Sequence, residues 1–485
     1  MEEKFGSNIL IIQGTASHAG KSILVTALCR IFVNERIKVA PFKAQNMSLN
    51  SWVTRDGKEI GIAQAIQAKG ARLEPRVEMN PILLKPKGDT TSQIVLMGEP
   101  FRDVEAGEYY ARSRELSNVV EEALRTLSFE NELIIIEGAG SPAEINLYEQ
   151  DLANTFVSRL TRAPIILVAD IERGGVFASI YGTIKLLPDD IQRQVKGIVI
   201  NKFRGDRRIL EPGIDEIEEM LKIPVLGVLP YVDMNIPSED SVSIQDKRPG
   251  EGVEIAIIRL PRISNFTDFE PLEIEANVRY ISLSEKLGNP DAIIIPGTKN
   301  TIKDLIELKE GNLFDEIIKE RGKIPIIGIC GGYQMLGKRI IDEGLEGGDN
   351  VEMDGLGLLD VETKFESYRK RTVQVEKTVH GKGPILGKID GEKIWGYEIH
   401  MGETRSKNPI FGEDGSVDDT GLVFGTYLHG IFENENFKDA FLDYLCERRG
   451  IKRRRIEEGD QFELLASIVE RNIDMDEVRR IIGFN

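Results

Sequence analysis

The sequence is poor in the residues and runs that mark secreted and membrane proteins. Its 485 residues include three cysteines, Cys29, Cys330 and Cys446. Their odd number and wide separation exclude a disulfide framework and fit a reducing compartment. No apolar run approaches the roughly 18 residues of a membrane helix. The acidic N-terminus enters a strand-like run at once, which is unlike a signal peptide. We therefore expect a cytoplasmic protein without a membrane partner.

Positive charge is also in short supply. Lysine and arginine total 62 against 80 aspartate and glutamate residues, which leaves a net charge of −18. Such a protein repels phosphate backbones, so we expect no nucleic-acid partner. An anionic ligand must instead be met by a local cluster of donors. The length exceeds one ordinary core and predicts two or three domains. The oligomeric state, a homo-oligomer included, is left open.

Short runs of isoleucine, valine and leucine alternate with longer mixed segments in the first half. These runs are residues 8–14, 37–42, 132–140, 163–170, 195–201 and 224–230. Such runs are typical of parallel strands buried on both faces, so residues 1–240 are expected to form a doubly wound α/β domain. A polar stretch with proline and glycine predicts a linker over residues 241–251. The pattern restarts in a second α/β domain over residues 252–447. Residues 448–485 are expected to be helical and to cap that second domain.

The stretch "IIQGTASHAGKS", residues 11–22, has the order strand, glycine loop, helix start. Gly14 and Gly20 enclose five residues and are followed by Lys21 and Ser22, one residue more than in the common P-loop. Glycines let backbone N–H groups surround phosphate oxygens, and the helix N-terminus adds its positive dipole end. Lys21 adds a cation, and the Ser22 hydroxyl can ligate Mg²⁺. The loop therefore predicts a nucleotide site with Mg²⁺.

Three further polar residues follow predicted strands in the first half. Glu137, in "IIIEGAGS", is expected to hold the metal together with Ser22, since ligands gather at strand ends of open α/β sheets. Asp170 is either a ligand of the same site or a helix N-cap. Asn201 begins "NKFRGD", which resembles the base-reading motif N-K-x-D except that Arg204 stands where the aspartate belongs. We expect Asn201 to contact the nucleotide, without a preference for guanine.

The stretch "GICGGYQ" puts Cys330 between glycines directly after an apolar run. This is the pattern of a nucleophile elbow, a sharp strand-to-helix turn. The helix N-terminus that follows would favour the thiolate. A catalytic cysteine needs a base, for which His429 is the candidate; His400 is more readily a structural histidine. Gly297 and Gly331 are the expected backbone donors of an oxyanion hole.

The motifs "GICGGYQMLG" and "YLHGIF" together resemble class I glutamine amidotransferases. The resemblance implies that Cys330 attacks the side-chain amide of glutamine, forms a thioester and releases ammonia. In the usual H-x-E pattern of that class the glutamate orients the histidine, but here Ile431 takes its place. This departure points to the branch of cobyrinic and cobyric acid amidating synthases. It leaves the group that orients His429 unassigned.

The first half resembles the same branch and, more distantly, dethiobiotin synthetase. That resemblance implies that ATP, with Mg²⁺, phosphorylates a carboxylate and that nitrogen displaces the phosphate. The stretch "PFKAQNMSLNS", residues 41–51, resembles the cobyric acid synthases, which amidate the b, d, e and g carboxylates of adenosylcobyrinic acid a,c-diamide in cobalamin biosynthesis. The sister a,c-diamide synthases usually carry an aspartate in this stretch, where this sequence has Gln45 and Asn46. The metal-binding role of that aspartate is therefore not assigned to any residue here. The resemblance extends from Gly14 to His429 and implies a corrinoid and glutamine as partners.

Two lysines could meet the carboxylates of a corrinoid. Lys85 and Lys87 lie in "LLKPKGDTTSQ" beside serine and threonine hydroxyls, although a solvated loop is an equal alternative. Two other functions stay open: a cobyrinic acid a,c-diamide synthase, and a P-loop regulatory ATPase fused to a glutamine-sensing domain. The intact pair of Cys330 and His429 argues against an inert sensor. The order of amidations and a shielded path for ammonia are not accessible from the sequence.

Overall fold

The computed structural model describes residues 5–87, 91–111, 113–232, 252–366, 370–456 and 459–484. The chain packs as two units. Unit 1 comprises Met1–Ser48, Glu59–Ile236 and Glu458–Asn485, and unit 2 comprises Leu49–Lys58 and Pro237–Glu457. The predicted linker, residues 241–251, lies outside the described residues.

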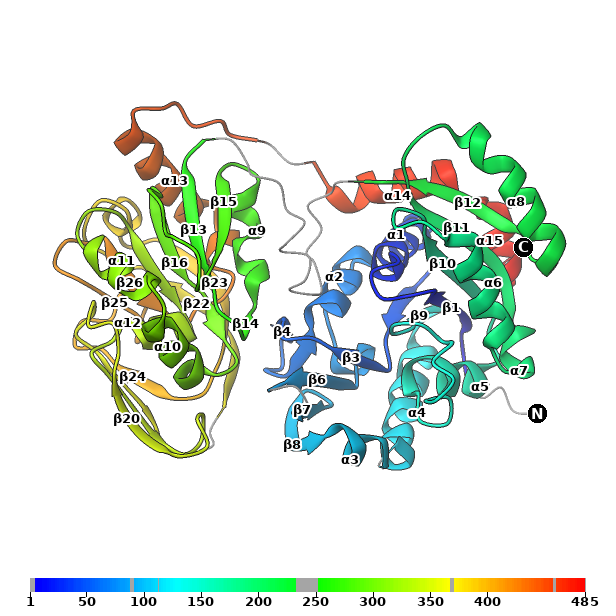
Figure 1. Ribbon diagram of the computed structural model, residues 1–485, viewed down its shortest axis with the longest axis horizontal. Helices are drawn as coiled ribbons and strands as arrows, with labels where there is room; N and C mark the ends of the chain where they lie inside the picture. The colour runs from blue at the N-terminus through cyan, green and yellow to red at the C-terminus, as the bar shows by residue number, and fades with distance from the viewer. Residues whose placement is uncertain are drawn as a thin grey trace. The chain divides into compact units, whose positions relative to one another are not determined.

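Unit 1 is built on a six-stranded parallel sheet (Figure 1). In spatial order its strands are β12 (Val225–Pro230), β11 (Val195–Phe203), β10 (Ile165–Asp170), β1 (Asn8–Gly14), β9 (Leu133–Glu137) and β2 (Val39–Phe42). Every predicted strand of the first half lies in this sheet, which confirms the α/β prediction. The strand order reverses at β1, whose neighbours are β9 and β10. Open α/β sheets bind ligands at such a switch point, outside the carboxyl ends of the strands.

Helices and a smaller sheet complete unit 1. The helices are α1 (Lys21–Asn34), α2 (Ile62–Gly70), α3 (Ala106–Ala111), α4 (Ser113–Glu130), α5 (Val157–Thr161), α6 (Val176–Leu186), α7 (Asp189–Gln192) and α8 (Arg207–Leu221). The smaller sheet has the order β3 (Gln45–Met47), β6 (Ile82–Pro86), β7 (Thr91–Leu96), β8 (Glu99–Glu105). Short pieces are β5 (Glu59–Gly61), η1 (Val77–Met79) and η2 (Leu152–Phe156). The sequence pattern did not predict the smaller sheet.

The C-terminal helices α14 (Gln461–Asn472) and α15 (Met475–Ile482) belong to unit 1. Leu465 and Val469 of α14 share a buried core with Leu24 of α1. Arg30 of α1 forms an ion pair with Glu463 at 3.1 Å. The helical prediction holds for residues 461–472 and 475–482 but not for residues 451–456, and the expectation that this tail caps the second domain was wrong. An apolar helix face predicts burial without naming the partner.

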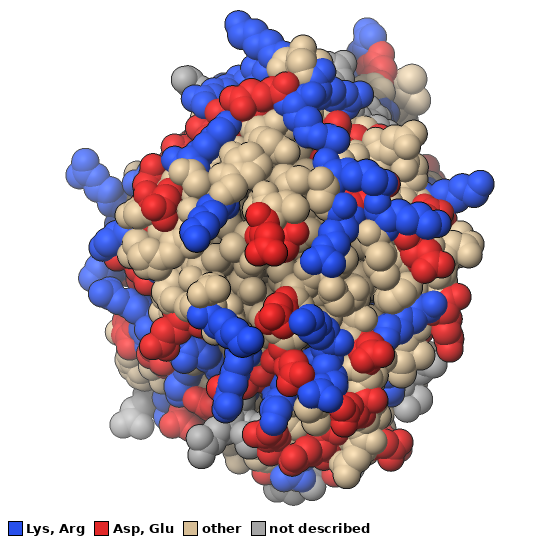
Figure 2. All heavy atoms as spheres, turned by 90° about the vertical axis from the view of Figure 1, so that its left-hand side faces the viewer, with Lys and Arg blue, Asp and Glu red and all other residues tan. Residues whose placement is uncertain are grey.

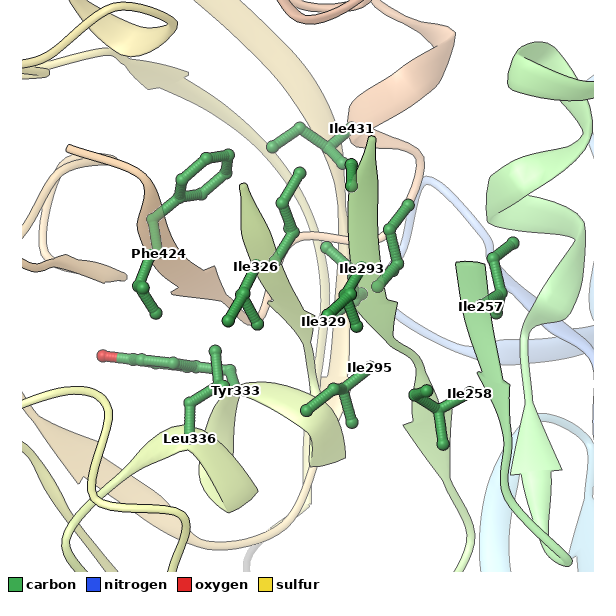
Figure 3. Close-up of a cluster of buried hydrophobic side chains, with 14 of the residues drawn as sticks. Ile257, Ile258, Ile293, Ile295, Ile326, Ile329, Tyr333, Leu336, Phe424 and Ile431 are labelled. Atoms are coloured by element: carbon green, nitrogen blue, oxygen red, sulfur yellow. The ribbon is translucent and has the colours of Figure 1, made fainter. Parts of the chain in front are cut away.

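Unit 2 is built on a second six-stranded sheet. In spatial order its strands are β15 (Asn277–Ser282), β13 (Glu254–Arg259), β16 (Ala292–Ile295), β18 (Ile326–Ile329), β26 (Val423–Thr426) and β25 (Ser416–Val417), with β25 alone antiparallel to its neighbour. Isoleucines of β13, β16 and β18 pack with side chains of α12 (Gly331–Leu336) in one buried cluster (Figure 3). This core anchors the turn between β18 and α12.

The remaining elements of unit 2 surround this sheet. The other helices are η4 (Phe266–Phe269), α9 (Glu270–Glu273), α10 (Thr301–Glu310), α11 (Leu313–Lys319), η5 (Leu386–Ile389), η6 (Ile431–Glu433) and α13 (Glu435–Arg449). The other strands are β4 (Ser51–Val53), β14 (Ile263–Ser264), β17 (Gly297–Thr298), β19 (Arg339–Glu343), β20 (Asn350–Asp354), β21 (Glu362–Phe365), β22 (Arg371–Thr378), β23 (Lys393–His400) and β24 (Glu403–Arg405).

The surface carries charges of both signs. Figure 2 shows basic and acidic side chains interspersed over the face that it displays. Of the helices that the structure describes, none combines the length and apolarity needed to cross a bilayer.

Candidate active sites

The glycine-rich loop connects β1 to α1 at the switch point of the first sheet. Gly14 ends β1, and Gly20 precedes α1 with φ +103°, in the left-handed region that favours glycine. A Cβ on Gly20 would lie 1.9 Å from Nδ2 of Asn201. Neither the backbone angle nor the space therefore admits a side chain at Gly20.

Lys21 lies across this loop. Its ammonium donates hydrogen bonds to the carbonyl oxygens of Ala16 and Gly140, each at 2.9 Å. One bond stays inside the loop, and the other reaches the segment that follows β9. The two bonds hold the positive charge of the lysine between the loop and that segment.

Glu137, at the end of β9, is the polar hub of unit 1. It is fully buried, and its Oε1 accepts hydrogen bonds from Ser22 Oγ at 2.8 Å and from Lys43 Nζ at 3.0 Å. Its Oε2 accepts from Nε2 of Gln67. A buried carboxylate needs such a cation and donors to offset its lost hydration. The predicted pair of Ser22 and Glu137 is therefore brought together.

No role was predicted from the sequence for Lys43 or Gln67. Lys43 follows β2, so the rule that ligands gather at strand ends could have found it. Gln67 lies inside α2, where no local signal distinguishes it from other helical glutamines.

Asn201 lies against the phosphate loop. Its Nδ2 donates to the carbonyl oxygen of Ala19 at 3.0 Å, and its Oδ1 accepts from the backbone N–H of Lys202 at 2.8 Å. The side chain is buried against the loop. Its place beside the loop agrees with a nucleotide site, and its contact with the base stays a prediction.

Three charged residues for which a ligand-binding role was considered, Asp170, Lys85 and Lys87, form ion pairs within the protein. Asp170 Oδ2 lies 2.9 Å from Nζ of Lys202, and its Oδ1 accepts from the N–H of Glu172 at 2.8 Å. Lys85 is buried in an ion pair with Glu59. Lys87 lies 2.7 Å from a carboxylate oxygen of Asp103 and is partly exposed. The substrate contact predicted for both lysines stays a prediction.

The cysteine elbow of unit 2 has the geometry that its sequence predicts. Cys330 follows β18 and precedes α12, with φ 51° and ψ −110°. This left-handed φ is costly for a residue with a side chain, and such strain concentrates at functional sites. A Cβ on Gly332 would lie 1.9 Å from the carbonyl oxygen of Ile295, so the turn packs directly on β16. The thiol is largely buried.

His429 and Asp268 form a buried pair beside the cysteine. Nδ1 of His429 lies 2.6 Å from Oδ2 of Asp268, whose Oδ1 accepts from the N–H of Gly430 at 3.0 Å. Burial alone lowers the pKa of His429, but the charge of Asp268 and hydrogen bonds to Asp268 and Cys330 outweigh it and raise the pKa to about 10. The side chains of Cys330, His429 and Asp268 therefore form one contiguous set.

Asp268 was not predicted from the sequence as the partner of His429. It lies on η4, within the stretch "SNFTDFEPL", far upstream of the histidine. The sequence indicated its existence only indirectly. Because the glutamate of the H-x-E pattern is absent, another acidic residue is needed to orient the His429 ring. The sequence does not say which of the many acidic residues fills that place.

The two predicted oxyanion glycines lie at this set. A Cβ on Gly297 would be 3.3 Å from Cε1 of His429, and a Cβ on Gly331 would be 2.7 Å from Cγ2 of Thr298. Both glycines thus line the turn, and their role as donors stays a prediction. His400 instead stacks on Tyr427 with ring centroids 3.6 Å apart, as expected of a structural histidine.

The described residues contain no cluster of three or more histidine, cysteine, aspartate or glutamate side chains able to hold a metal. Mg²⁺ in nucleotide sites needs fewer, because phosphates and water supply most ligands. The Ser22 hydroxyl donates a hydrogen bond to Glu137, which leaves the lone pairs of the Ser22 oxygen for a cation. That Glu137 itself binds the metal stays a prediction. These donors fit Mg²⁺ held together with a nucleotide.

Two family models together match most of the chain. Residues 10–242 match the family model of the CobQ/CobB/MinD/ParA nucleotide binding domain, and residues 254–437 match that of the CobB/CobQ-like glutamine amidotransferase domain.

Relatives named "Probable cobyric acid synthase" match along the whole chain. The protein of Methanosarcina barkeri is 60% identical over 480 residues, covering 98% of this chain and 99% of the relative. That of Methanococcoides burtonii is also 60% identical, covering 98% and 97%. That of Archaeoglobus fulgidus is 54% identical, covering 96% and 98%. A solved structure of PurLQS from Thermotoga maritima matches with a TM-score of 0.30 and 21% identity, covering 40% of this chain and 99% of that one. The chain therefore belongs to the cobyric acid synthase family, enzymes of cobalamin biosynthesis that combine a nucleotide-binding domain with a glutamine amidotransferase domain.

Proposed function

We propose that this protein uses ATP and glutamine to amidate the b, d, e and g carboxylates of adenosylcobyrinic acid a,c-diamide, giving adenosylcobyric acid. The observation that carries the proposal is the presence, on one chain, of a phosphate loop joined to Glu137 and a cysteine elbow joined to a His429–Asp268 pair. The names of the relatives support the corrinoid substrate. The free cysteines support a cytoplasmic location.

The second unit would supply ammonia. The Cys330 thiolate attacks the side-chain carbonyl carbon of glutamine, and the N–H groups of Gly297 and Gly331 stabilise the oxyanion. Protonated His429 gives its proton to the departing nitrogen, so ammonia leaves and a thioester remains. His429 then takes a proton from water, which attacks the thioester and releases glutamate. The charge of Asp268 stabilises the imidazolium form of His429 before the first proton transfer and after the second.

The first unit would activate the acid. A substrate carboxylate oxygen attacks the γ-phosphorus of ATP, and ADP leaves. Ammonia then displaces phosphate from the acyl phosphate and loses a proton. Lys21 and the loop N–H groups stabilise the charge on the transferred group. Ser22 would ligate Mg²⁺, which polarises the phosphate oxygens, and Glu137 would hold the Ser22 hydroxyl in place.

We propose that the corrinoid carboxylates bind near Lys85 and Lys87. Both lysines already pair with carboxylates of the protein, Glu59 and Asp103. A substrate carboxylate would therefore compete for a positive charge, more easily at the partly exposed Lys87 than at the buried Lys85.

The test of the reaction is mass spectrometry of the corrinoid after incubation with ATP, Mg²⁺ and glutamine. Each amidation replaces OH with NH₂, so one mass step is expected for each of the b, d, e and g carboxylates. Amidation of cobyrinic acid at its a and c carboxylates instead would identify the sister activity. Glutamine hydrolysis without any amidation would favour a glutamine sensor.

The two-site mechanism is tested with Cys330→Ser. The variant should lose glutamine-dependent amidation and retain amidation with added ammonium. Cys446→Ser, in α13 of the same unit, is the matched control and should behave as wild type. Loss of the ammonium reaction together with the glutamine reaction in Cys330→Ser would contradict the mechanism.

A further inference from the structure

A short segment from the first half of the sequence packs inside unit 2. Leu49–Lys58 belongs to unit 2, although Met1–Ser48 before it and Glu59–Ile236 after it belong to unit 1. The segment contains β4, whose residues are all buried. Asn50 and Ser51 end the stretch "PFKAQNMSLNS" of the sequence analysis.

The segment forms hydrogen bonds with Asn265 and Phe266, the turn that precedes Asp268. Oδ1 of Asn50 accepts from the N–H of Phe266 at 3.2 Å. The N–H of Ser51 donates to Oδ1 of Asn265 at 3.3 Å, and Nδ2 of Asn265 donates back to the Ser51 carbonyl oxygen at 3.2 Å. Asn265 has φ 51°, and its own carbonyl oxygen accepts from the N–H of Asp268 at 3.1 Å. Three hydrogen bonds from Asn50 and Ser51 thus hold Asn265 and Phe266, the turn that precedes Asp268.

The same segment also forms a hydrogen bond with Tyr397 of β23, a tyrosine whose ring stacks on His429. The hydroxyl of Tyr397 donates to the Ser51 carbonyl oxygen at 3.0 Å and accepts from Nδ2 of Asn265 at 3.0 Å. Its ring lies nearly parallel to the His429 ring, with centroids 5.3 Å apart and planes 18° apart. The Trp52 ring packs on Tyr397 with centroids 5.0 Å apart.

The backbones of Tyr397 and His429 are joined as well. The Tyr397 N–H donates to the His429 carbonyl oxygen at 3.2 Å, and the His429 N–H donates to the Tyr397 carbonyl oxygen at 2.9 Å. A shift of Tyr397 would therefore move the backbone and the ring of His429 together.

We propose that Asn50, Ser51 and Trp52 are positioning residues for glutamine hydrolysis. They act through Asp268 and Tyr397, which hold His429 against Cys330. The proposal rests on the proposed roles of Cys330 and His429. Its physical basis is that misplacing a catalytic group by about 1 Å can cost about 10²-fold in rate. The first half of the sequence would then contribute to both half-reactions.

The test compares Asn50→Ala with Asn50→Asp in the full chain. Alanine removes the acceptor for the Phe266 N–H, whereas aspartate keeps an oxygen there. We expect Asn50→Ala to lower kcat for glutamine hydrolysis about 10- to 100-fold with little change in KM, and Asn50→Asp to recover most of it. NMR should show a lower pKa of His429 in the alanine variant. Asn312→Ala, at an exposed asparagine before α11, is the control.

A second variant guards against misfolding. Tyr397→Phe keeps the ring stack and removes only the hydroxyl that bonds Ser51 and Asn265. It should lower kcat in the same direction while ammonium-dependent amidation stays at the wild-type rate. Unchanged glutamine kinetics in both Asn50→Ala and Tyr397→Phe would overturn the proposal, as would an equal loss of the glutamine and ammonium reactions. If the wild-type protein does not hydrolyse glutamine, the proposed function fails. If the wild type does so and the variants match it, only the positioning role fails.

Discussion

Oδ2 of Asp268 lies 2.6 Å from Nδ1 of His429, although 161 positions of sequence separate the two residues. Both side chains are buried, so solvent screens their attraction little. Asp268 therefore makes the contact with the ring that the glutamate of an H-x-E pattern is expected to make. Asp268 lies elsewhere in the sequence than that glutamate, but it contacts the imidazole ring of His429 in the way expected of the glutamate.

Asp268→Asn tests the importance of this charge. The amide keeps the shape but removes the charge that stabilises the imidazolium, and it can favour the wrong tautomer. We expect kcat for glutamine hydrolysis to fall about 10²- to 10⁴-fold, by analogy with other triads, while ammonium-dependent amidation is retained. Glutamate release is the measurement, and Asp419→Asn, at an exposed aspartate, is the control. Wild-type glutamine kinetics in Asp268→Asn would contradict the assignment.

The raised pKa of His429 predicts a pH-dependent stability. The pKa is about 10 in the folded protein against an ordinary value of 6.5. A raised folded pKa contributes stability that is complete below about pH 6.5 and is lost as the pH rises through about 10. The Tm difference between wild type and Asp268→Asn should therefore be largest at the acid end of this window and shrink toward its basic end. Calorimetry at several pH values measures it, and a gap that is constant with pH would refute the pairing.

Gly332→Ala should disrupt the elbow. Its Cβ would lie 1.9 Å from the Ile295 carbonyl oxygen. This oxygen belongs to the buried strand β16, so its displacement would cost packing and hydrogen-bond energy. We expect a loss of about 1–3 kcal/mol in the free energy of unfolding, as for other overpacked cores, and a loss of glutamine hydrolysis. Gly387→Ala is the matched control, because its nearest neighbouring atom is 3.8 Å away. Similar Tm values for the two variants would argue against the close packing of the turn.

Gly20→Ala should weaken nucleotide binding. The φ of +103° strains any side chain, and the new Cβ would lie 1.9 Å from Asn201. A cost of about 1–3 kcal/mol to hold this backbone corresponds to about a 5- to 150-fold weaker Kd for ATP, measured by calorimetry. Gly182→Ala, with no neighbouring atom within 4 Å, should bind ATP as wild type does. Equal affinity of Gly20→Ala and wild type would show that the loop does not carry the phosphates.

Contiguous motifs were predictable because their geometry is local. The strand, loop and helix around Lys21 and the turn at Cys330 follow from glycine spacing and the apolar runs beside them, which confine the backbone to few conformations. The same runs predicted the strands of the first sheet, because strands buried on both faces must be apolar throughout.

Long-range pairs were not predictable in the same way. Lys43 and Glu137 lie 94 positions apart, and Asn50 and Phe266 lie 216 positions apart. The sequence contains 80 acidic residues, so composition alone cannot choose the partner of a given cation.

By itself, the sequence determined where the backbone turns sharply and which segments must be buried, since both depend on side chains a few residues apart. Only the tertiary structure decided that Asp268 orients toward His429, that the C-terminal helices lie on α1, and that residues 49–58 pack in unit 2. Each of these depends on which surfaces meet after the chain has folded, and a face that must be buried does not specify what will cover it.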